Sequence, residues 1–290
     1  MAKSNFKNSG QKKHGDYSKF IKGKKAPIKT KAKKVVKVVK RSVPKDQSTA
    51  VYNADGTMRL NKFIAHSGVC SRREADTLIG SGVIKVNGKV VTELGLKVMR
   101  TDKVTMDGQL LKTEKLQYVL LNKPKGFITT TDDPYERKTV MSLVEKSCSE
   151  RIYPVGRLDK ETTGLLLFTN DGELAKKLTH PKHNVRKMYH VYLNKDVSKN
   201  DLKSLVEGLK LEDGFIAADK AAFVDNKPKN EVGIELHSGK NRIVRRIFES
   251  LDYRVVKLDR VIFAGLTKKD LPRGRWRFLS EKELNFIKMI

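Results

Sequence analysis

One stretch of the chain decides the fold, residues 156–172, which read Gly156-Arg157-Leu158-Asp159-Lys160-Glu161-Thr162-Thr163-Gly164-Leu165-Leu166-Leu167-Phe168-Thr169-Asn170-Asp171-Gly172. The apolar run at 165–169 predicts a buried strand, and the polar residues before it predict a loop that carries Asp159. A loop aspartate most often makes a turn with its own backbone. The residues alone therefore leave open whether Asp159 is structural or catalytic.

The sequence on both sides of this stretch predicts further strands and helices. Apolar and β-branched runs predict strands at 118–122, 153–158, 165–169, 188–193, 232–236, 254–258 and 275–279. Helical spacing predicts helices at 171–180 and 202–209, and the capping box Ser280-Glu281-Lys282-Glu283 begins a terminal helix. Because the helices are interspersed irregularly, residues 117–290 are expected to form an α+β domain with a mixed, mainly antiparallel sheet.

A smaller unit precedes this domain, at residues 58–112. Leu60, Phe63 and Ile64 have the spacing of an apolar helix face, and Ser71-Arg72-Arg73-Glu74 is a capping box that begins a second helix. Two β-branched runs flank Asn87-Gly88, which predicts a hairpin at 83–91. The unit is therefore expected to contain two short helices and a hairpin, with residues 113–116 as the linker to the larger domain.

The smaller unit resembles the S4 RNA-binding domain. The matching elements are 59–63, Gly68, 71–75, Gly82 and 86–88. Four basic side chains lie at or beyond the edges of the apolar helix faces, where they are available to bind phosphates. These residues are Arg59, Lys62, Arg72 and Arg73.

The larger domain resembles the pseudouridine synthases that carry an S4 domain. Residues 156–172 resemble their active-site motif, Gly-Arg-Leu-Asp-x-x-Thr-x-Gly-Leu-Leu-Leu-x-Thr-Asn-Asp-Gly, and Lys187-Met188-Tyr189 resembles a Lys-x-Tyr element. Residues 239–248 resemble a Gly-x-Asn-Arg-Gln-Val-Arg-Arg-Met-Phe element, with Ile243 where the family often has glutamine. Segments 258–260 and 271–277 also fit, so the resemblance covers residues 58–290.

The resemblance implies a reaction that breaks the N1–C1′ bond of a uridine, rotates the base and rejoins it through C5, with no metal or organic cofactor. It implies that Asp159 is the catalytic carboxylate, acting as a nucleophile toward the ribose or as a base at C2′. Tyr189 would stack on the base and handle the C5 proton, although a strand tyrosine is more often packing. Leu258 would lie under the base or simply in the core, and Arg157 would position the loop or contact RNA.

The segment that follows Gly239 predicts a helix with one apolar face and basic residues outside it. Five apolar side chains share one arc of a predicted helix: Ile243, Val244, Ile247, Phe248 and Leu251. Arg245 lies at the margin of this arc, where its guanidinium can turn inward, and the resemblance implies that it pairs with Asp159. It could instead be one more phosphate contact. Lys240, Arg242 and Arg246 are expected to contact phosphates or to be solvated.

Composition favours a polyanionic partner. The chain has 61 Lys and Arg residues against 33 Asp and Glu, a net charge of +28. Cys70 and Cys148 are the only cysteines, too few for a disulfide framework or a cysteine zinc site. His180 and His183 lack acidic or cysteine partners, so no metal is expected. No apolar run approaches the length of a membrane span and no signal peptide is evident, so a cytoplasmic protein is expected.

Residues 1–57 are expected to be a disordered basic tail, with 16 Lys and Arg residues against three acids. Such a tail could act only as a solubilising segment. It could also be a flexible arm that adds phosphate affinity without sequence preference.

The function expected from these features is modification of a uridine in ribosomal RNA or in an assembling ribosomal subunit. The segments 129–134 and 271–277 look closest to enzymes of the large subunit, which favours 23S rRNA. A 16S rRNA enzyme and a non-catalytic RNA-binding assembly factor are the alternatives. No obligate protein partner is evident, so a monomer is expected.

Overall fold

The computed structural model describes residues 52, 53 and 55–290. Most of the predicted basic tail, residues 1–51 and 54, therefore lies outside the described residues. The described chain separates into two compact units: residues 188–259 form one, and the residues before 188 and after 259 form the other.

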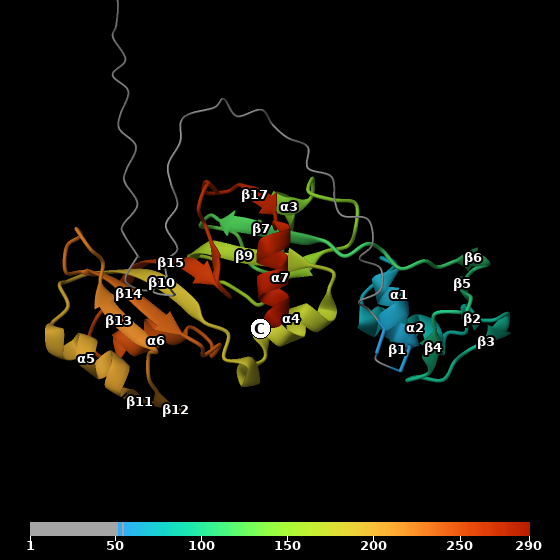
Figure 1. Ribbon diagram of the computed structural model, residues 1–290, viewed down its shortest axis with the longest axis horizontal. Coiled ribbons are helices and arrows are strands. Elements are labelled where there is room, and N and C mark those ends of the chain that lie inside the picture. Colours follow the sequence, from blue (N-terminus) through green and yellow to red (C-terminus); the bar gives the residue numbers. More distant parts are fainter. Residues whose placement is uncertain (1–51, 54) are drawn as a thin grey trace, which may run out of the picture. The chain divides into compact units, whose positions relative to one another are not determined.

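The S4-like module, residues 58–112, contains the expected helices and hairpin (Figure 1). Ser71 accepts a hydrogen bond from the Glu74 amide, while the Glu74 carboxylate accepts one from the Ser71 amide, so the predicted capping box is present. Strand β1 pairs with β4, and the other strands form a sheet in the order β3-β2-β5-β6. The elements are β1 (Thr57–Arg59), α1 (Leu60–His66), α2 (Arg72–Gly80), β2 (Ile84–Val86), β3 (Lys89–Val90), β4 (Lys97–Met99), β5 (Val104–Met106) and β6 (Gln109–Leu110).

Residues just before Met58 contact the S4-like module. Tyr52 packs against the apolar core of the module, and the Arg100 guanidinium lies 5.0 Å from the centre of its ring. The Asn53 amide also donates to the Thr57 carbonyl. Two residues assigned to the tail by the sequence therefore contact the module, because Tyr52 offers an aromatic ring to its apolar core.

The same unit contains the strands that carry the 156–172 segment. Strand β9 pairs antiparallel with β7 from Tyr118↔Thr169 to Lys123↔Gly164, and β17 pairs antiparallel with the other edge of β7. Leu174 and Leu178 of α4 and Leu284 and Ile287 of α7 belong to the same apolar core as these strands. The elements are β7 (Tyr118–Lys123), α3 (Met141–Val144), β8 (Tyr153–Pro154), β9 (Thr163–Thr169), α4 (Gly172–Thr179), a short 3-10 helix (Pro181–His183), β16 (Leu266–Thr267), β17 (Trp276–Phe278) and α7 (Glu281–Met289).

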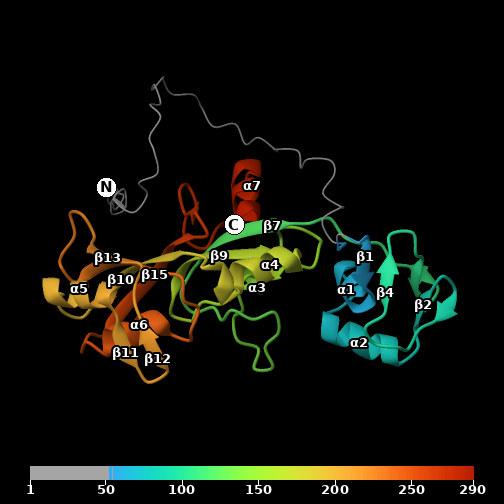
Figure 2. The same ribbon diagram turned by 60° about the horizontal axis from the view of Figure 1, so that its bottom comes forward.

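The unit formed by 188–259 is built on neighbouring strands in the order β13-β14-β10-β15. Helix α5 packs against β13, and α6 packs against β11 (Figure 2). The elements are β10 (Lys187–Leu193), α5 (Lys199–Glu207), β11 (Leu209–Leu211), β12 (Gly214–Ile216), β13 (Lys220–Phe223), β14 (Glu231–Leu236), α6 (Ile243–Glu249) and β15 (Val255–Phe263).

The α+β class is confirmed, with differences in detail. The strand expected at 153–158 ends at Pro154, since Gly156 turns the chain with a φ of +74°. Helix α5 begins at Lys199, because Ser198 caps it by accepting from the Asp201 amide. The sequence does not single out the β11–β12 hairpin, because Asp213-Gly214 after the helix expected at 202–209 is also typical of a helix end. Asp213-Gly214 is the tight turn of this hairpin, which pairs Leu211 with Gly214.

Candidate functional site

Asp159 lies in the loop between β8 and β9 and is half-buried. Its carbonyl oxygen accepts a hydrogen bond from the Thr162 amide at 3.0 Å, which closes a tight turn around residues 159–162. Arg157 is exposed and Leu158 is buried. The loop is therefore a compact turn with Leu158 anchored in the core and Asp159 at the edge of solvent.

A buried lysine holds the backbone of this loop. Lys123, the last residue of β7, is 0% exposed, and its Nζ lies 2.8 Å from the Thr162 carbonyl oxygen, 3.1 Å from the Asp159 and Lys160 oxygens and 3.2 Å from that of Pro124. Burial lowers the pKa of Lys123 to about 8, although the charges of Glu161 and Asp159 oppose this effect. An ammonium group can donate to several carbonyl oxygens at once. Lys123 therefore fixes the backbone of the loop that carries Asp159.

Lys123 is a residue that sequence reasoning missed as part of the site. The sequence Lys123-Pro124-Lys125-Gly126 after an apolar strand predicts only a turn at this position. Lysine is among the residues least often fully buried, so its position at the end of an apolar strand gave no sign of this contact.

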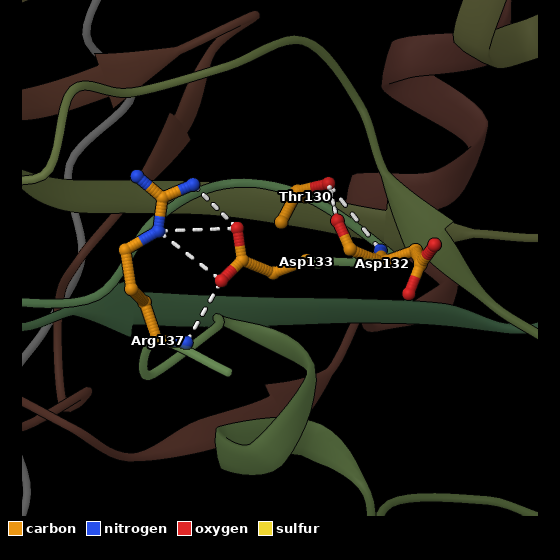
Figure 3. A network of polar contacts seen from close by, with 4 residues as sticks. All are labelled: Thr130, Asp132, Asp133 and Arg137. Atoms are coloured by element: carbon orange, nitrogen blue, oxygen red, sulfur yellow. Dashed lines mark hydrogen bonds and ion pairs between the residues drawn. The ribbon is translucent and has the colours of Figure 1, made fainter. Parts of the chain in front are cut away.

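A second segment, residues 127–139, supports the same loop. The Thr129 hydroxyl donates to the Leu158 carbonyl oxygen at 2.7 Å and accepts from the Leu158 amide at 3.3 Å. The Arg137 guanidinium binds the Asp133 carboxylate (Figure 3), and this contact lowers the pKa of Asp133. The supporting segment is therefore itself held in shape by a local ion pair.

The predicted 271–277 element reaches the same strand end. Arg273 Nη1 lies 2.6 Å from Asn122 Oδ1 and 3.3 Å from the Lys123 carbonyl oxygen, while Asn122 Nδ2 donates to the Leu271 carbonyl oxygen. This element therefore fixes the end of β7 that presents Lys123.

Tyr189, Arg245 and Leu258 belong to the other unit, formed by 188–259. Tyr189 on β10 is 9% exposed and Leu258 on β15 is 4% exposed, and these strands are neighbours. Arg245 is half-buried on α6, and its Nη1 donates to the Val255 carbonyl oxygen at 3.0 Å. This unit thus anchors Arg245 to the first residue of the strand that carries Leu258.

The three cations expected to contact phosphates near α6 differ in their surroundings. Arg246 donates to the Asp213 carboxylate from both terminal guanidinium nitrogens, Nη1 at 3.0 Å and Nη2 at 2.6 Å. This contact lowers the Asp213 pKa to about 2. Lys240 Nζ donates to the Asp213 carbonyl oxygen at 2.9 Å. Arg242 is exposed, precedes α6 in a left-handed conformation, and lies 3.8 Å from Glu249. The turn of the β11–β12 hairpin therefore engages two of the three cations.

Of the four basic residues predicted on the S4-like module, Arg59, Arg72 and Arg73 are exposed. Lys62 is not available as expected: it is 8% exposed, and its Nζ lies 2.8 Å from Glu173 on α4. The helix pattern placed Lys62 at the margin of the apolar face. In the folded unit this margin contacts α4, so Lys62 pairs with a carboxylate of the larger domain.

The cysteines and acidic residues offer no second centre. Burial raises the pKa of both the Cys70 and the Cys148 thiol, which disfavours the reactive thiolate. Among residues 52, 53 and 55–290, no group of three His, Cys, Asp or Glu side chains is placed to hold a metal ion. No helix in this part of the chain is long and apolar enough to span a membrane.

Comparison with known proteins agrees with the architecture. The S4 domain profile matches residues 58–104, and the RNA pseudouridylate synthase profile matches residues 117–250. Ribosomal large subunit pseudouridine synthase B of Bacillus subtilis is 43% identical over 235 residues, covering 80% of this chain and 96% of the relative. The synthase B of Vibrio vulnificus is 36% identical over 238 residues, covering 79% of this chain and 74% of the relative.

A crystal structure of a pseudouridylate synthase superposes with a TM-score of 0.57 at 29% identity, covering 79% of this chain and 99% of that one. The α+β fold and the S4 domain, together with these relatives, thus define an RNA-modifying enzyme. The chain belongs to the RNA pseudouridylate synthase family, in the group whose members carry an S4 domain, and it is an RNA pseudouridine synthase.

Proposed function

We propose that this enzyme isomerises a specific uridine of the large-subunit rRNA, 23S rRNA, to pseudouridine. The observation that carries the choice of RNA is the 43% identity over nearly the whole length of a ribosomal large subunit pseudouridine synthase B. The exposed Arg59, Arg72 and Arg73 of the S4-like module support an RNA substrate, because exposed guanidinium groups bind phosphates.

In the proposed reaction, Asp159 is the central group. Its ionised carboxylate attacks the ribose or removes a proton at C2′, which allows the N1–C1′ bond to break. The base then rotates, a C5–C1′ bond forms, C5 loses its proton and N1 gains one. Atoms and electrons are conserved over the whole cycle, so the chemistry calls for no cofactor. The contacts of Lys123 and Thr129 with the loop backbone support a fixed position for Asp159.

The other proposed residues bind the uridine base, keep Asp159 ionised or contact the RNA backbone. A uridine must leave its stack to reach Asp159, so Tyr189 would stack on the base and Leu258 would line the pocket beneath it. Arg245 would keep Asp159 ionised, since a guanidinium remains charged at all working pH values. Four basic residues would contact the RNA backbone: Arg157, Lys240, Arg242 and Arg246. Lys240 and Arg246 would first have to exchange their contacts with Asp213 for contacts with phosphate.

The same proposal includes a monomer that acts on rRNA or on an assembling subunit in the cytoplasm. It is tested by mapping pseudouridines in rRNA from a strain in which Asp159→Ala replaces the wild-type protein. Loss of one pseudouridine from 23S rRNA is the expected result. Loss from 16S rRNA would correct the target, and an unchanged map in both subunits would refute the enzymatic role in rRNA.

A further inference from the structure

A basic pocket lies on α4, away from the residues assigned to the reaction. It has a volume of about 430 Å³ and is formed by α4, the short 3-10 helix and the end of α7. Six of its nine lining residues carry a lysine or histidine side chain. These residues are Lys176, Lys177, His180, Lys182, His183 and Lys288.

The two carboxylates of the pocket are already engaged by groups outside this basic set. Asp171 accepts from the Leu174 amide at 3.1 Å and from the Tyr118 hydroxyl at 2.8 Å. Glu173 pairs with Lys62 at 2.8 Å. Neither carboxylate forms an ion pair with a pocket lysine among the described residues, although the charge of Lys176 helps to lower the Glu173 pKa. Four lysines outnumber the two carboxylates, so the pocket retains a net positive charge.

Two of the lysines have structural partners and two do not. Lys177 Nζ donates to the Lys288 carbonyl oxygen near the end of α7, and Lys288 Nζ lies 5.6 Å from the centre of the Tyr118 ring. Within the described part of the chain, the ammonium groups of Lys176 and Lys182 make no hydrogen bond or ion pair. These two exposed cations are therefore available to an incoming anion.

The histidines suit the same ligand. His180 Nδ1 accepts from the Lys182 amide at 3.2 Å, which leaves Nε2 on the far edge of its ring. His183 lies edge-to-face with His180, and partial burial together with the charges of Lys182 and Lys177 lowers its pKa. The neighbouring ammonium groups of Lys182 and Lys177 contribute to this shift, so His183 lies beside two of the cations of the pocket.

Helix α4 contacts both the S4-like module and the segment that leads to Asp159. Near its start, Glu173 binds Lys62 of the S4-like module. At its end, Thr179 Cγ2 lies 3.6 Å from the place where a Cβ on Gly156 would stand, three residues before Asp159. A helix of eight residues spans about 12 Å.

We propose that this pocket binds a phosphodiester group of the substrate RNA, between the S4-like module and the catalytic loop, with Lys176 and Lys182 as the principal contacts. This inference rests on the proposed function, because it assigns the anion to the same RNA. It adds a binding site that acts on affinity and leaves the chemical step unchanged.

The test compares Lys176→Gln/Lys182→Gln with a control of equal charge, Lys146→Gln/Lys269→Gln, whose lysines are exposed and lie outside the pocket. Binding of the full-length protein to an rRNA fragment is measured from 50 to 200 mM salt. The pocket variant should bind about five- to tenfold more weakly, with a log K against log salt slope less negative by about one. The control should retain the wild-type slope, and the pocket variant should retain kcat at saturating RNA.

Equal affinity and slope for the pocket variant and the wild type would overturn the proposal. A second arm follows the His183 ring signal during titration with inorganic phosphate. A response to free phosphate, combined with unchanged RNA binding by the pocket variant, would make this a site for small anions and also overturn the RNA assignment. Because binding is measured without turnover, an enzyme that failed to make pseudouridine would refute the proposed function and leave this test intact.

Discussion

The Nζ of Lys123 lies 3.1 Å from the main-chain carbonyl oxygen of Asp159, so a fully buried ammonium holds the backbone of the proposed catalytic residue. The same ammonium also reaches Thr162 at the far end of the turn. The position of the Asp159 carboxylate therefore depends on a charge that is itself out of contact with solvent.

Replacing Asp159 with asparagine should abolish turnover while preserving the fold. The amide keeps the size of the carboxylate but cannot ionise, so the rate should fall by at least about a thousandfold. Product is measured by chromatographic separation of the nucleosides released from the rRNA fragment, because uridine and pseudouridine have the same mass, and folding is measured by thermal denaturation. Undiminished turnover by this variant would remove Asp159 from the mechanism.

Replacing Lys123 with methionine should damage both stability and catalysis. The change leaves buried carbonyls without their donor, at a cost of about 2–4 kcal/mol, and the loop that carries Asp159 loses its central contact. Urea denaturation and single-turnover rates provide the measurements. Lys125→Met is the matched control, because Lys125 is exposed and only pairs with Glu161 at 3.6 Å, so its effect should stay below about 0.5 kcal/mol.

The Lys123 pKa predicts that, as the pH rises, the contribution of Lys123 to stability increases while kcat falls. Burial lowers this pKa from 10.5 to about 8, so between these values the unfolded chain keeps the proton that the folded chain releases. Unfolding then takes up a proton, and the contribution of Lys123 to the free energy of unfolding increases with pH over this window. The neutral amine has fewer protons to donate to the loop, so kcat should fall.

The measurement for this prediction is the difference in unfolding free energy between the wild type and Lys123→Met at pH 7.5 and pH 9.5. The difference should grow at the higher pH, while the wild-type kcat decreases. A constant difference across both pH values would show that Lys123 does not change protonation in this range.

Arg245 and Arg246 are adjacent on α6, yet their substitutions should have different effects. Arg245→Lys keeps the charge but loses the fork that binds Val255 and, as proposed, Asp159, so kcat should drop by about 10²-fold. Arg246→Lys alters an exposed pair with Asp213, so it should change RNA affinity only a few-fold. Steady-state kinetics separate the two, and a KM effect alone for Arg245→Lys would assign this residue to RNA binding.

Lys62 should behave as a structural residue and Arg72 as an RNA contact. Lys62→Met removes the ion pair with Glu173, and we expect about 1 kcal/mol of lost stability with faster proteolysis in the 113–116 linker. Arg72→Met should leave the stability unchanged and make the salt slope of RNA binding less negative by about one. If Lys62→Met alone reduced that slope, the sequence-based assignment of Lys62 would be restored.

Features governed by local sequence were predictable, and those governed by distant contacts were not. The Ser71 and Ser280 capping boxes each involve residues three positions apart, so four residues of sequence were sufficient to locate both helix starts. The Asp159 loop followed from the glycines and the apolar run around it. Lys123 lies 36 residues before Asp159, and Lys62 lies 111 residues before Glu173. Pattern and propensity carry no information about pairs so far apart.

The hairpin at β11–β12 shows a different limit. Asp213-Gly214 suits either the end of a helix or a tight turn, and only the pairing of the strands on each side decides between them. The ion pairs of Asp213 with Arg246 and Lys240 depend on that turn. A single ambiguous dipeptide therefore concealed the surroundings of two predicted RNA contacts.

Lys123 binds only main-chain oxygens in the Asp159 turn, and this has a consequence for how the enzyme can change. The side chains of Lys160 and Glu161 are exposed and take no part in that contact. Substituting these two residues should alter the surface presented to RNA without moving the Asp159 carboxylate. Substitutions at these two positions should therefore change the loop surface while the hydrogen bonds of Lys123 to the main chain remain.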